Sequence, residues 1–279
     1  MTSPAGQPGR DQQGEPRVSV IVPVYNEADT VAEVVARVLA LDPALEVVLV
    51  DDGSTDGTPA ALADLPSDPR LLVHRLPANL GKGAAVRTGL ALARGEFVVV
   101  QDADLELEPE ELTRVLAPLL AGEAEAVYGS RFRQGRGGAP LGLYWANRAL
   151  TLVANLLYRC RLTDEATGYK ACSRELWLSL NLQAVGFELC PEVTAKLLRR
   201  GARIREVPVA YRPRSKQQGK KLRALRDGLR ALWTLLKWRV LPVPRGPGGP
   251  ESVGTTDLRA ESAETADLRE KWAPAEAER

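Results

Sequence analysis

Three acidic residues stand at alternate positions after an apolar run of the chain. The run ends at Val100, and Asp102, Asp104 and Glu106 follow it. Like charges this close together raise one another's free energy unless a cation or hydrogen-bond donors offset them. Mg²⁺ and Mn²⁺ prefer oxygen ligands of this kind and keep positions open for phosphate oxygens. The spacing therefore predicts a site for a divalent metal and a diphosphate, although Asp-rich turns without a metal are also common.

Two further loops have the composition of a nucleotide site. The stretch DDGSTDGT is a turn that can cap the next helix, and its Asp51 or Asp52 could equally accept hydrogen bonds from a base or ribose. The stretch NLGKGAAVRTG places Lys82 at a predicted helix N-terminus, where backbone N–H groups and an ammonium together favour an anion. The spacing GxxxxGK[ST] is absent, so this loop is not a P-loop.

The histidine and cysteine content excludes several kinds of chemistry. His74 is the single histidine, which excludes Ser-His-Asp and Cys-His catalysis and histidine-ligated metals. Cys160, Cys172 and Cys190 form no CxxC pair and are odd in number, so we expect neither a disulfide framework nor a zinc site. A reducing cytoplasm fits this cysteine usage best.

These loops need elements that bring them together, and the pattern of the first half supplies them. Apolar, β-branched runs alternate with segments of helical periodicity, which is typical of an α/β fold with a mostly parallel sheet and helices on both faces. Ligands of such sheets bind beyond the carboxyl ends of the strands, so the polar loops should converge on one edge. We expect strands over 18–24, 46–50, 71–76 and 96–100, and helices over 28–41, 59–65, 82–94 and 110–120.

The second half of the sequence has a looser pattern. We expect a strand over 124–130, helices over 143–159 and 188–201, an edge strand over 203–214 and a helix over 221–240. The last helix is amphipathic and could lie on a membrane surface or pack on the core of the domain. One of its faces carries Leu222, Leu225, Leu229, Leu232 and Leu236.

Charge is unevenly distributed along the chain. The formal net charge is +1, but residues 196–239 contain 15 Lys and Arg against two acidic residues. This excess predicts an anionic partner for the basic segment. No apolar run approaches the ~18 residues needed to span a bilayer. We expect a disordered leader over 1–16, a catalytic domain over 17–220, the amphipathic helix over 221–241 and a disordered tail over 242–279.

The motifs together resemble the family-2 inverting glycosyltransferases, in particular the dolichol-phosphate-mannose-synthase-like branch. The likeness covers residues 17–240 and rests on seven motifs in the same order. They are VSVIVPVYNE, VVLVDDGSTDGT, NLGKGAAVRTGL, VVVQDADLELEPEEL, VYGSRF, DEATGYKA and REVPVAYRPRSKQQGKKL. The resemblance implies a glycosyltransferase A fold, Mg²⁺ or Mn²⁺ as cofactor, a GDP- or UDP-sugar donor and a polyprenyl (dolichyl or undecaprenyl) phosphate acceptor.

The resemblance also implies roles for individual residues. Asp102, Asp104 and Arg131 are the expected catalytic residues, and Arg131 is also expected at the acceptor phosphate. Metal ligands are expected at Asp102, Asp104 and Glu106, the last of which replaces the Gln usual in this branch. The nucleotide is expected at Pro23, Tyr25, Glu27, Asp51, Asp52, Gly81, Lys82 and Asp102, and the acceptor phosphate also at Arg214, Lys220 and Lys221. A further family arginine is replaced by Tyr144, for which Arg148 could compensate.

A phosphate acceptor simplifies the expected chemistry. It is already an anion at neutral pH, so direct displacement at the anomeric carbon needs no general base and the enzyme mainly supplies cations. We expect an enzyme at the cytoplasmic face of the membrane, with no nucleic-acid partner. The alternatives are a family-2 enzyme with a soluble or non-lipid acceptor, a sugar-1-phosphate nucleotidyltransferase and a silent membrane-bound scaffold. PVYNE replaces the Gly-rich loop that a nucleotidyltransferase needs, and the intact acidic and basic motifs argue against a scaffold.

Overall fold

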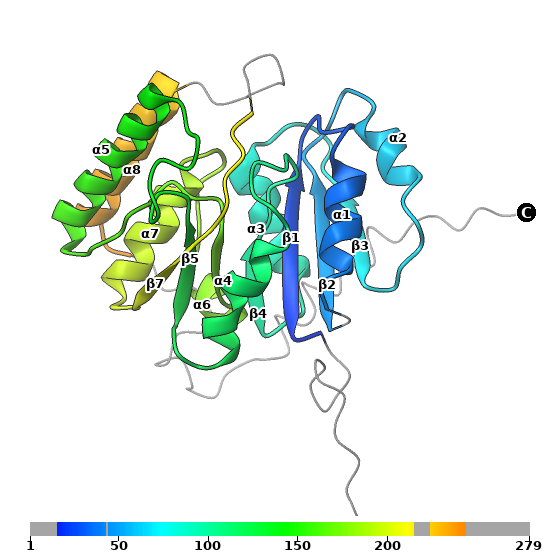
Figure 1. The fold of residues 1–279 in the computed structure, drawn as a ribbon, viewed down its shortest axis with the longest axis horizontal. Coiled ribbons are helices and arrows are strands. Elements are labelled where there is room, and N and C mark those ends of the chain that lie inside the picture. Colours follow the sequence, from blue (N-terminus) through cyan, green and yellow to red (C-terminus); the bar gives the residue numbers. More distant parts are fainter. Residues whose placement is uncertain (1–15, 43, 215–223, 244–279) are drawn as a thin grey trace, which may run out of the picture.

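The computed structural model of this protein describes residues 16–42, 44–214 and 224–243 (Figure 1). Most of the predicted leader and of the predicted tail therefore lies outside the described residues, as do Lys220, Lys221 and Leu222. The strands are β1 (Val18–Val24), β2 (Leu45–Asp51), β3 (Leu71–Arg75), β4 (Phe97–Val100), β5 (Ala126–Ser130), β6 (Lys170–Ser173) and β7 (Ile204–Pro208). The helices are α1 (Val31–Leu39), α2 (Thr58–Ala63), α3 (Lys82–Leu92), α4 (Glu111–Leu120), α5 (Leu141–Tyr158), α6 (Arg174–Ser179), α7 (Leu189–Arg199) and α8 (Ala224–Val240).

The strands form a single seven-stranded sheet in the order β3-β2-β1-β4-β6-β5-β7. β1 pairs in parallel with β2 and β4, β2 with β3, and β5 with β7. β6 lies between β4 and β5 and is antiparallel to both. The predicted α/β fold with a mostly parallel sheet is confirmed. β6 and α6 were not predicted from the sequence, because the four-residue strand is too short to show a period.

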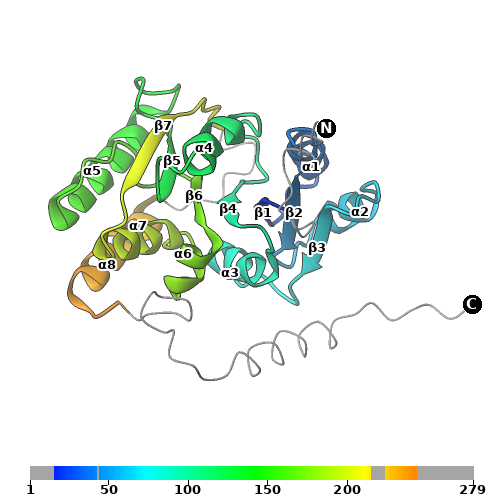
Figure 2. The ribbon, with the colours of Figure 1, turned by 90° about the horizontal axis from the view of Figure 1, so that it is seen from below.

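Helices cover both faces of the sheet (Figure 2). On one face α1 and α4 pack against alternate strand residues such as Val20, Val22 and Val99. On the other face α3, α6 and α7 pack against the intervening positions, among them Ile21 and Val98. Side chains of a strand alternate between faces, so a sheet buried on both sides needs the near-continuous apolar runs that this sequence contains.

A third, smaller cluster joins α5, α7 and α8 at the end of the molecule that carries β7. Leu235 and Trp238 of α8 pack on Ala154 of α5 and Ala195 of α7. α8 therefore packs on the domain, one of the two alternatives that the sequence left open. Two leucines of its predicted apolar face nevertheless stay exposed, Leu229 at 60% and Leu236 at 41%. No helix in the described part of the chain is long and apolar enough to cross a bilayer.

The direction of the strands brings the polar loops together as expected. All strands except β6 point the same way, so the loops after β1, β2, β4, β5 and β7 emerge at one edge. The antiparallel β6 begins at that edge, which adds the residues before Lys170 to the same group of loops.

Trp177 should be a major contributor to stability. It is 1% exposed on α6, and its Nε1–H donates to the carbonyl oxygen of Val98, 3.0 Å away. We expect Trp177→Ala to lower the free energy of unfolding by about 3–5 kcal/mol, because the change leaves a cavity and removes this hydrogen bond. Trp233 is 67% exposed, so Trp233→Ala is the matched control. It should change the free energy of unfolding by less than about 0.5 kcal/mol. Urea denaturation of both variants would test this, and equal losses would contradict it.

Candidate functional site

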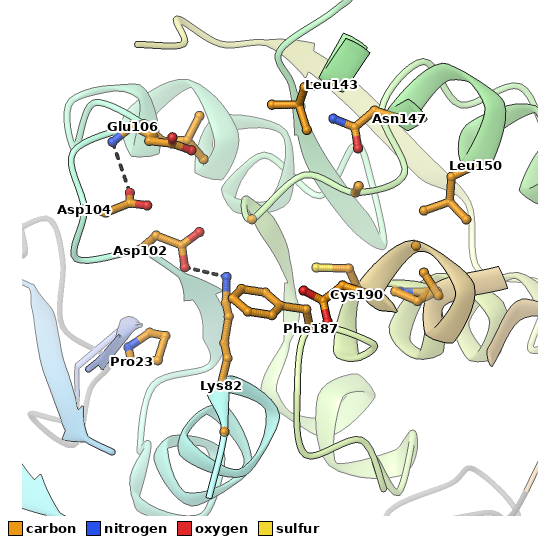
Figure 3. A pocket seen from close by; sticks show the side chains of 18 of the residues that line it. Pro23, Lys82, Asp102, Asp104, Glu106, Leu143, Asn147, Leu150, Phe187 and Cys190 are labelled. Carbon is orange, nitrogen blue, oxygen red and sulfur yellow. Dashed lines mark hydrogen bonds and ion pairs between the residues drawn. The ribbon is translucent and has the colours of Figure 1, made fainter. Parts of the chain in front are cut away.

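A cavity of about 600 Å³ opens at the edge where the loops converge (Figure 3). Its walls come from the loops after β1, β2, β4, β5 and β7, from the start of α3, and from α5, α7 and α8. Most residues that the sequence predicted for a site line this one cavity. They are Pro23, Tyr25, Glu27, Asp52, Gly81, Lys82, Asp102, Asp104, Glu106, Arg131 and Arg214.

The acidic pair after β2 holds the backbone of the neighbouring loops. Both carboxylate oxygens of Asp52 accept backbone N–H groups, from Leu80 at 2.8 Å and Gly81 at 2.8 Å. Burial raises the pKa of Asp52, and these two hydrogen bonds oppose the rise. Asp51 is fully buried, accepts from the Ser54 N–H at 2.9 Å and lies 3.3 Å from the Nε of Arg75.

Both acids were predicted at a base and ribose, and that stays a prediction; Asp52 lines the cavity, whereas Asp51 does not. The reason is that its side chain is needed inside the turn. The backbone N–H of Gly81 lies at the helix N-terminus where the sequence predicted an anion. It donates a hydrogen bond to Asp52.

Lys82 and Asp102 form an ion pair across the cavity floor. The Nζ of Lys82 lies 2.5 Å from Oδ1 of Asp102, and both side chains are mostly buried (Figure 3). Burial is the largest single influence and would lower the pKa of Lys82, but the charges of Asp102 and Asp104 and the hydrogen bond to Asp102, among others, together raise it. The lysine therefore keeps its positive charge at the point where α3 begins.

Asp104 and Glu106 lie beside this pair in the turn after β4. Oδ1 of Asp104 accepts the Glu106 N–H at 3.1 Å (Figure 3). Burial, together with the charges of Asp102 and Glu106, raises the pKa of Asp104 to about 7. Glu106 accepts the Arg214 N–H at 2.9 Å and the Tyr211 hydroxyl at 3.4 Å. A further cation would relieve this concentration of negative charge. Carboxylate oxygen atoms are the ligands that Mg²⁺ and Mn²⁺ prefer.

The three carboxylates predicted as metal ligands are not gathered around one point. Among the described residues, no group of three or more His, Cys, Asp and Glu side chains is arranged to hold a metal ion. Asp102 turns toward Lys82, and Glu106 is engaged by the chain around Arg214. The chemistry of the donors fits a divalent ion, but the predicted set of Asp102, Asp104 and Glu106 is not assembled.

Arg131 is held rigidly in the cavity wall by a residue that the sequence analysis did not single out. Its Nε and Nη2 donate to the two carboxylate oxygens of Asp164 at 2.7 and 2.8 Å, and its backbone N–H donates to the same group at 3.0 Å. Asp164 is fully buried, and the guanidinium carbon of Arg131 lies 5.1 and 5.2 Å from the ring centres of Phe132 and Tyr211. Asp164 opens the motif DEATGYKA, so the signal was present, but the sequence alone did not pair it with Arg131.

Arg214 and Glu27 were predicted for different ligands, and the structure joins them. Nη1 of Arg214 lies 2.7 Å from Oε2 of Glu27, and Nη2 donates to the hydroxyl of Thr30 at 3.2 Å. Arg148, proposed as a substitute for a family arginine, donates to the Thr163 carbonyl oxygen at 3.0 Å and is not a lining residue of the cavity. Its side chain is used to tie α5 to the loop before β6.

The far end of the cavity is apolar and was not predicted as a site. It is formed where α5 and α8 approach each other. Its α5 and α8 residues include Leu143, Leu150, Val153, Ala231 and Leu232. One cavity thus combines a charged end at the sheet with an apolar end between two helices.

Comparisons with known proteins agree with this architecture. Residues 19–177 match the family described as Glycosyl transferase family 2. A polyprenol monophosphomannose synthase of Mycolicibacterium smegmatis is 34% identical over 241 residues, covering 80% of this chain and 87% of that protein. A dolichol-phosphate mannosyltransferase of Pyrococcus furiosus is 30% identical over 234 residues, covering 80% of this chain and 64% of that protein.

A solved structure shows the same fold. Glucosyl-3-phosphoglycerate synthase from Mycobacterium tuberculosis, in complex with Mn²⁺, UDP and glucosyl-3-phosphoglycerate, superposes with a TM-score of 0.61 at 26% identity and covers 82% of each chain. The predicted glycosyltransferase A fold is confirmed, and the names of the relatives match the predicted branch. The motifs, the sheet and these matches together show that this chain belongs to glycosyltransferase family 2.

Proposed function

We propose that this protein transfers a sugar from a GDP- or UDP-sugar to a polyprenyl phosphate, with inversion at the anomeric carbon. The observation that carries the proposal is the single cavity with a charged end for phosphates and an apolar end between α5 and α8. The names of two relatives, a polyprenol monophosphomannose synthase and a dolichol-phosphate mannosyltransferase, support it.

The donor is assigned to the charged end of the cavity. Pro23, Tyr25 and Glu27 would border the base, and Asp52 with Gly81 would shape the ribose side. Lys82 provides a buried positive charge next to Asp102, where the sugar and its diphosphate would lie. Asp104 and Glu106, with Asp102 close by, are the residues that would hold Mg²⁺ or Mn²⁺. Such an ion would stabilise the charge of the departing nucleoside diphosphate.

The acceptor phosphate is assigned to Arg131, with Arg214 as a second cation. Asp164 occupies Nε and Nη2 of Arg131 and thereby fixes the direction of its guanidinium. A phosphate monoester is anionic at neutral pH, so the enzyme has to orient it and needs no general base. Lys220 and Lys221 remain assigned to the same phosphate, although they lie outside the described residues.

The exposed apolar side chains of α5 and α8 support a peripheral contact with the cytoplasmic face of a membrane. On α5, Trp145, Leu152 and Leu156 are 58–71% exposed, and on α8 Leu229, Trp233, Leu236 and Val240 are 41–81% exposed. Both sets follow helical spacing, so each forms a stripe along one side of its helix. The two helices pack against each other beside the apolar end of the cavity (Figure 1). A membrane there would deliver a lipid acceptor directly to the cavity.

A transfer assay tests the proposal. Purified protein would be incubated with UDP- and GDP-sugars and Mn²⁺, with a short polyprenyl phosphate or with 3-phosphoglycerate as acceptor. We expect transfer to the polyprenyl phosphate, loss of that transfer with chelator, and a β-linked product from an α-linked donor. Transfer to 3-phosphoglycerate at the higher rate would favour the second candidate, a soluble phosphorylated acceptor. That candidate is suggested by the ligand of the solved neighbour, but it leaves the apolar end of the cavity unexplained.

Asp104→Ala should abolish metal-dependent nucleotide binding and leave the fold intact. Its carboxylate is half-buried beside Glu106, and removing it takes away a charged oxygen ligand there. Calorimetry of UDP and GDP with and without Mn²⁺ would measure the effect. Asp64→Ala, at an exposed acid after α2, is the control and should bind like the wild type. Wild-type affinity in Asp104→Ala would remove this residue from the metal site.

Arg131→Ala should lower turnover with polyprenyl phosphate and leave donor binding near normal. Charge-assisted hydrogen bonds contribute roughly 1.5–3 kcal/mol, so kcat/KM for the acceptor should fall about 10- to 100-fold. Arg148→Ala, which removes an arginine outside the cavity, is the control and should keep most of the activity. An equal loss of nucleotide affinity in Arg131→Ala would move this residue to the donor side.

Binding to anionic vesicles should depend on the apolar stripes. We expect Trp145→Glu and Trp233→Glu to reduce sedimentation with such vesicles, because each places a carboxylate on an exposed apolar surface. Binding by the wild type should weaken at high salt, since attraction to anionic lipid is screened. Leu72→Glu changes another exposed apolar residue, 43% accessible and on the edge strand β3, and should bind normally. Uniform binding by all three variants would contradict the assignment.

A further inference from the structure

A charged pair on α7 is buried completely, away from the cavity walls. Glu192 is 1% exposed and Lys196 is fully buried, and the Nζ of the lysine lies 2.6 Å from Oε1 of the glutamate. Two charges withdrawn from water are retained only when further hydrogen bonds satisfy them. The other partners of this pair therefore indicate what it holds in place.

Those partners are the backbone groups of the loop between α6 and α7. Glu192 accepts the N–H of Gln183 at 3.0 Å and the N–H of Ala184 at 2.6 Å. Lys196 donates to the carbonyl oxygen of Asn181 at 2.7 Å, and its Nζ also lies 4.0 Å from the ring centre of Trp238 on α8. The pair thus fixes the loop residues 181–184 from one side.

From the other side, the same loop presses on the beginning of α3. The Val185 carbonyl oxygen accepts the N–H of Ala84 at 3.2 Å. A Cβ on Gly81, whose φ is +100°, would collide with that oxygen, and a Cβ on Gly83 would collide with the Ala184 carbonyl oxygen. The glycines on either side of Lys82 therefore allow the loop and the helix N-terminus to lie in direct backbone contact.

We propose that Glu192 and Lys196 are positioning residues for the donor end of the cavity. They hold the loop that seats the first turn of α3, and this turn places the Nζ of Lys82 against Asp102. The loop also carries Phe187 into the cavity wall beside Lys82 (Figure 3). The inference rests on the proposed function in one respect, since it takes Lys82 as a contact of the donor.

A purely structural role for the pair makes a different prediction. If Glu192 and Lys196 only fasten α7 to α8 through Trp238, their loss should lower stability and leave the relative affinities for donor and acceptor unchanged. A positioning role changes nucleotide affinity and the KM for the donor, while the KM for the acceptor stays the same. The two readouts separate the possibilities even when stability falls in both.

The first experiment compares Glu192→Gln with a matched buried carboxylate. Calorimetry with UDP and GDP in the presence of Mn²⁺ should show at least a tenfold loss of affinity in Glu192→Gln, with the acceptor KM within twofold of wild type. The matched residue is Glu46, which is 3% exposed. It accepts the backbone N–H of Arg94 at 2.7 Å and forms an ion pair with the guanidinium of the same arginine. Glu46 is remote from the first turn of α3. Glu46→Gln should lose stability and keep nucleotide affinity. Equal nucleotide affinity in the two variants would overturn the proposal.

Gly83→Ala tests the same contact without touching a buried charge. The added methyl group should push the Ala184 carbonyl away from α3 and reproduce the loss of nucleotide affinity. This variant decides the question if Glu192→Gln fails to fold, because alanine is a better helix residue than glycine. Unchanged nucleotide affinity in a folded Gly83→Ala protein would overturn the proposal.

A double-mutant cycle separates this inference from the donor assignment beneath it. If the pair acts through Lys82, Glu192→Gln combined with Lys82→Ala should bind nucleotide no more weakly than Lys82→Ala alone. If the double variant instead loses nucleotide affinity by the product of the two single losses, the positioning role is overturned and Lys82 stays assigned to the donor. Full affinity in the Lys82→Ala single variant would instead overturn the donor assignment of the proposed function, and the inference with it.

Discussion

The arrangement of this cavity depends on the balance of buried charge at one edge of the sheet. Parallel strands bring acidic loops to that edge, where desolvation and mutual repulsion would oppose folding unless each carboxylate found a partner. The partners come from distant segments: Lys82 for Asp102, Arg214 for Glu27 and Arg131 for Asp164. Each ion pair also fixes a loop, so the charges that are proposed to bind ligands are the same charges that hold the walls of the cavity.

This double use explains which parts of the site the sequence could predict. Asp102, Lys82 and Arg131 were recognisable because residue type, strand-end position and motif order pointed to the same edge. Their partners were not recognisable, since an ion pair between residues 131 and 164 depends on how β5 and the loop before β6 meet in space. Asp51 also accepts a backbone N–H within its own turn, a contact that the sequence did not indicate, and its place at the base and ribose stays a prediction.

The fold was predictable for a similar reason. β1 to β4 and their helices repeat a local pattern, and β1 begins and ends at the predicted residues. β6 has four residues, one of them the buried Lys170, and it lies between strands that precede it in the chain. Short strands of this kind are stabilised by contacts with neighbouring strands more than by the β-propensity of their own residues. The local sequence therefore does not predict them. The burial of α8 on one side and its exposure on the other likewise follow from contacts with α5 and α7.

The insertion of β6 between β4 and β5 has a consequence for how the chain is synthesised. The first four strands are neighbours in the sheet and precede all the others in the chain, but the second edge of β4 has its partner only once residues 170–173 have been made. β5 cannot substitute, because its register is set by β6 on one side and β7 on the other. The growing chain therefore carries an open, apolar strand edge over roughly seventy residues of elongation, which is an interval of several seconds at the usual rate of synthesis. Until then, that edge of the nascent first half presents unpaired backbone groups that could pair with another chain.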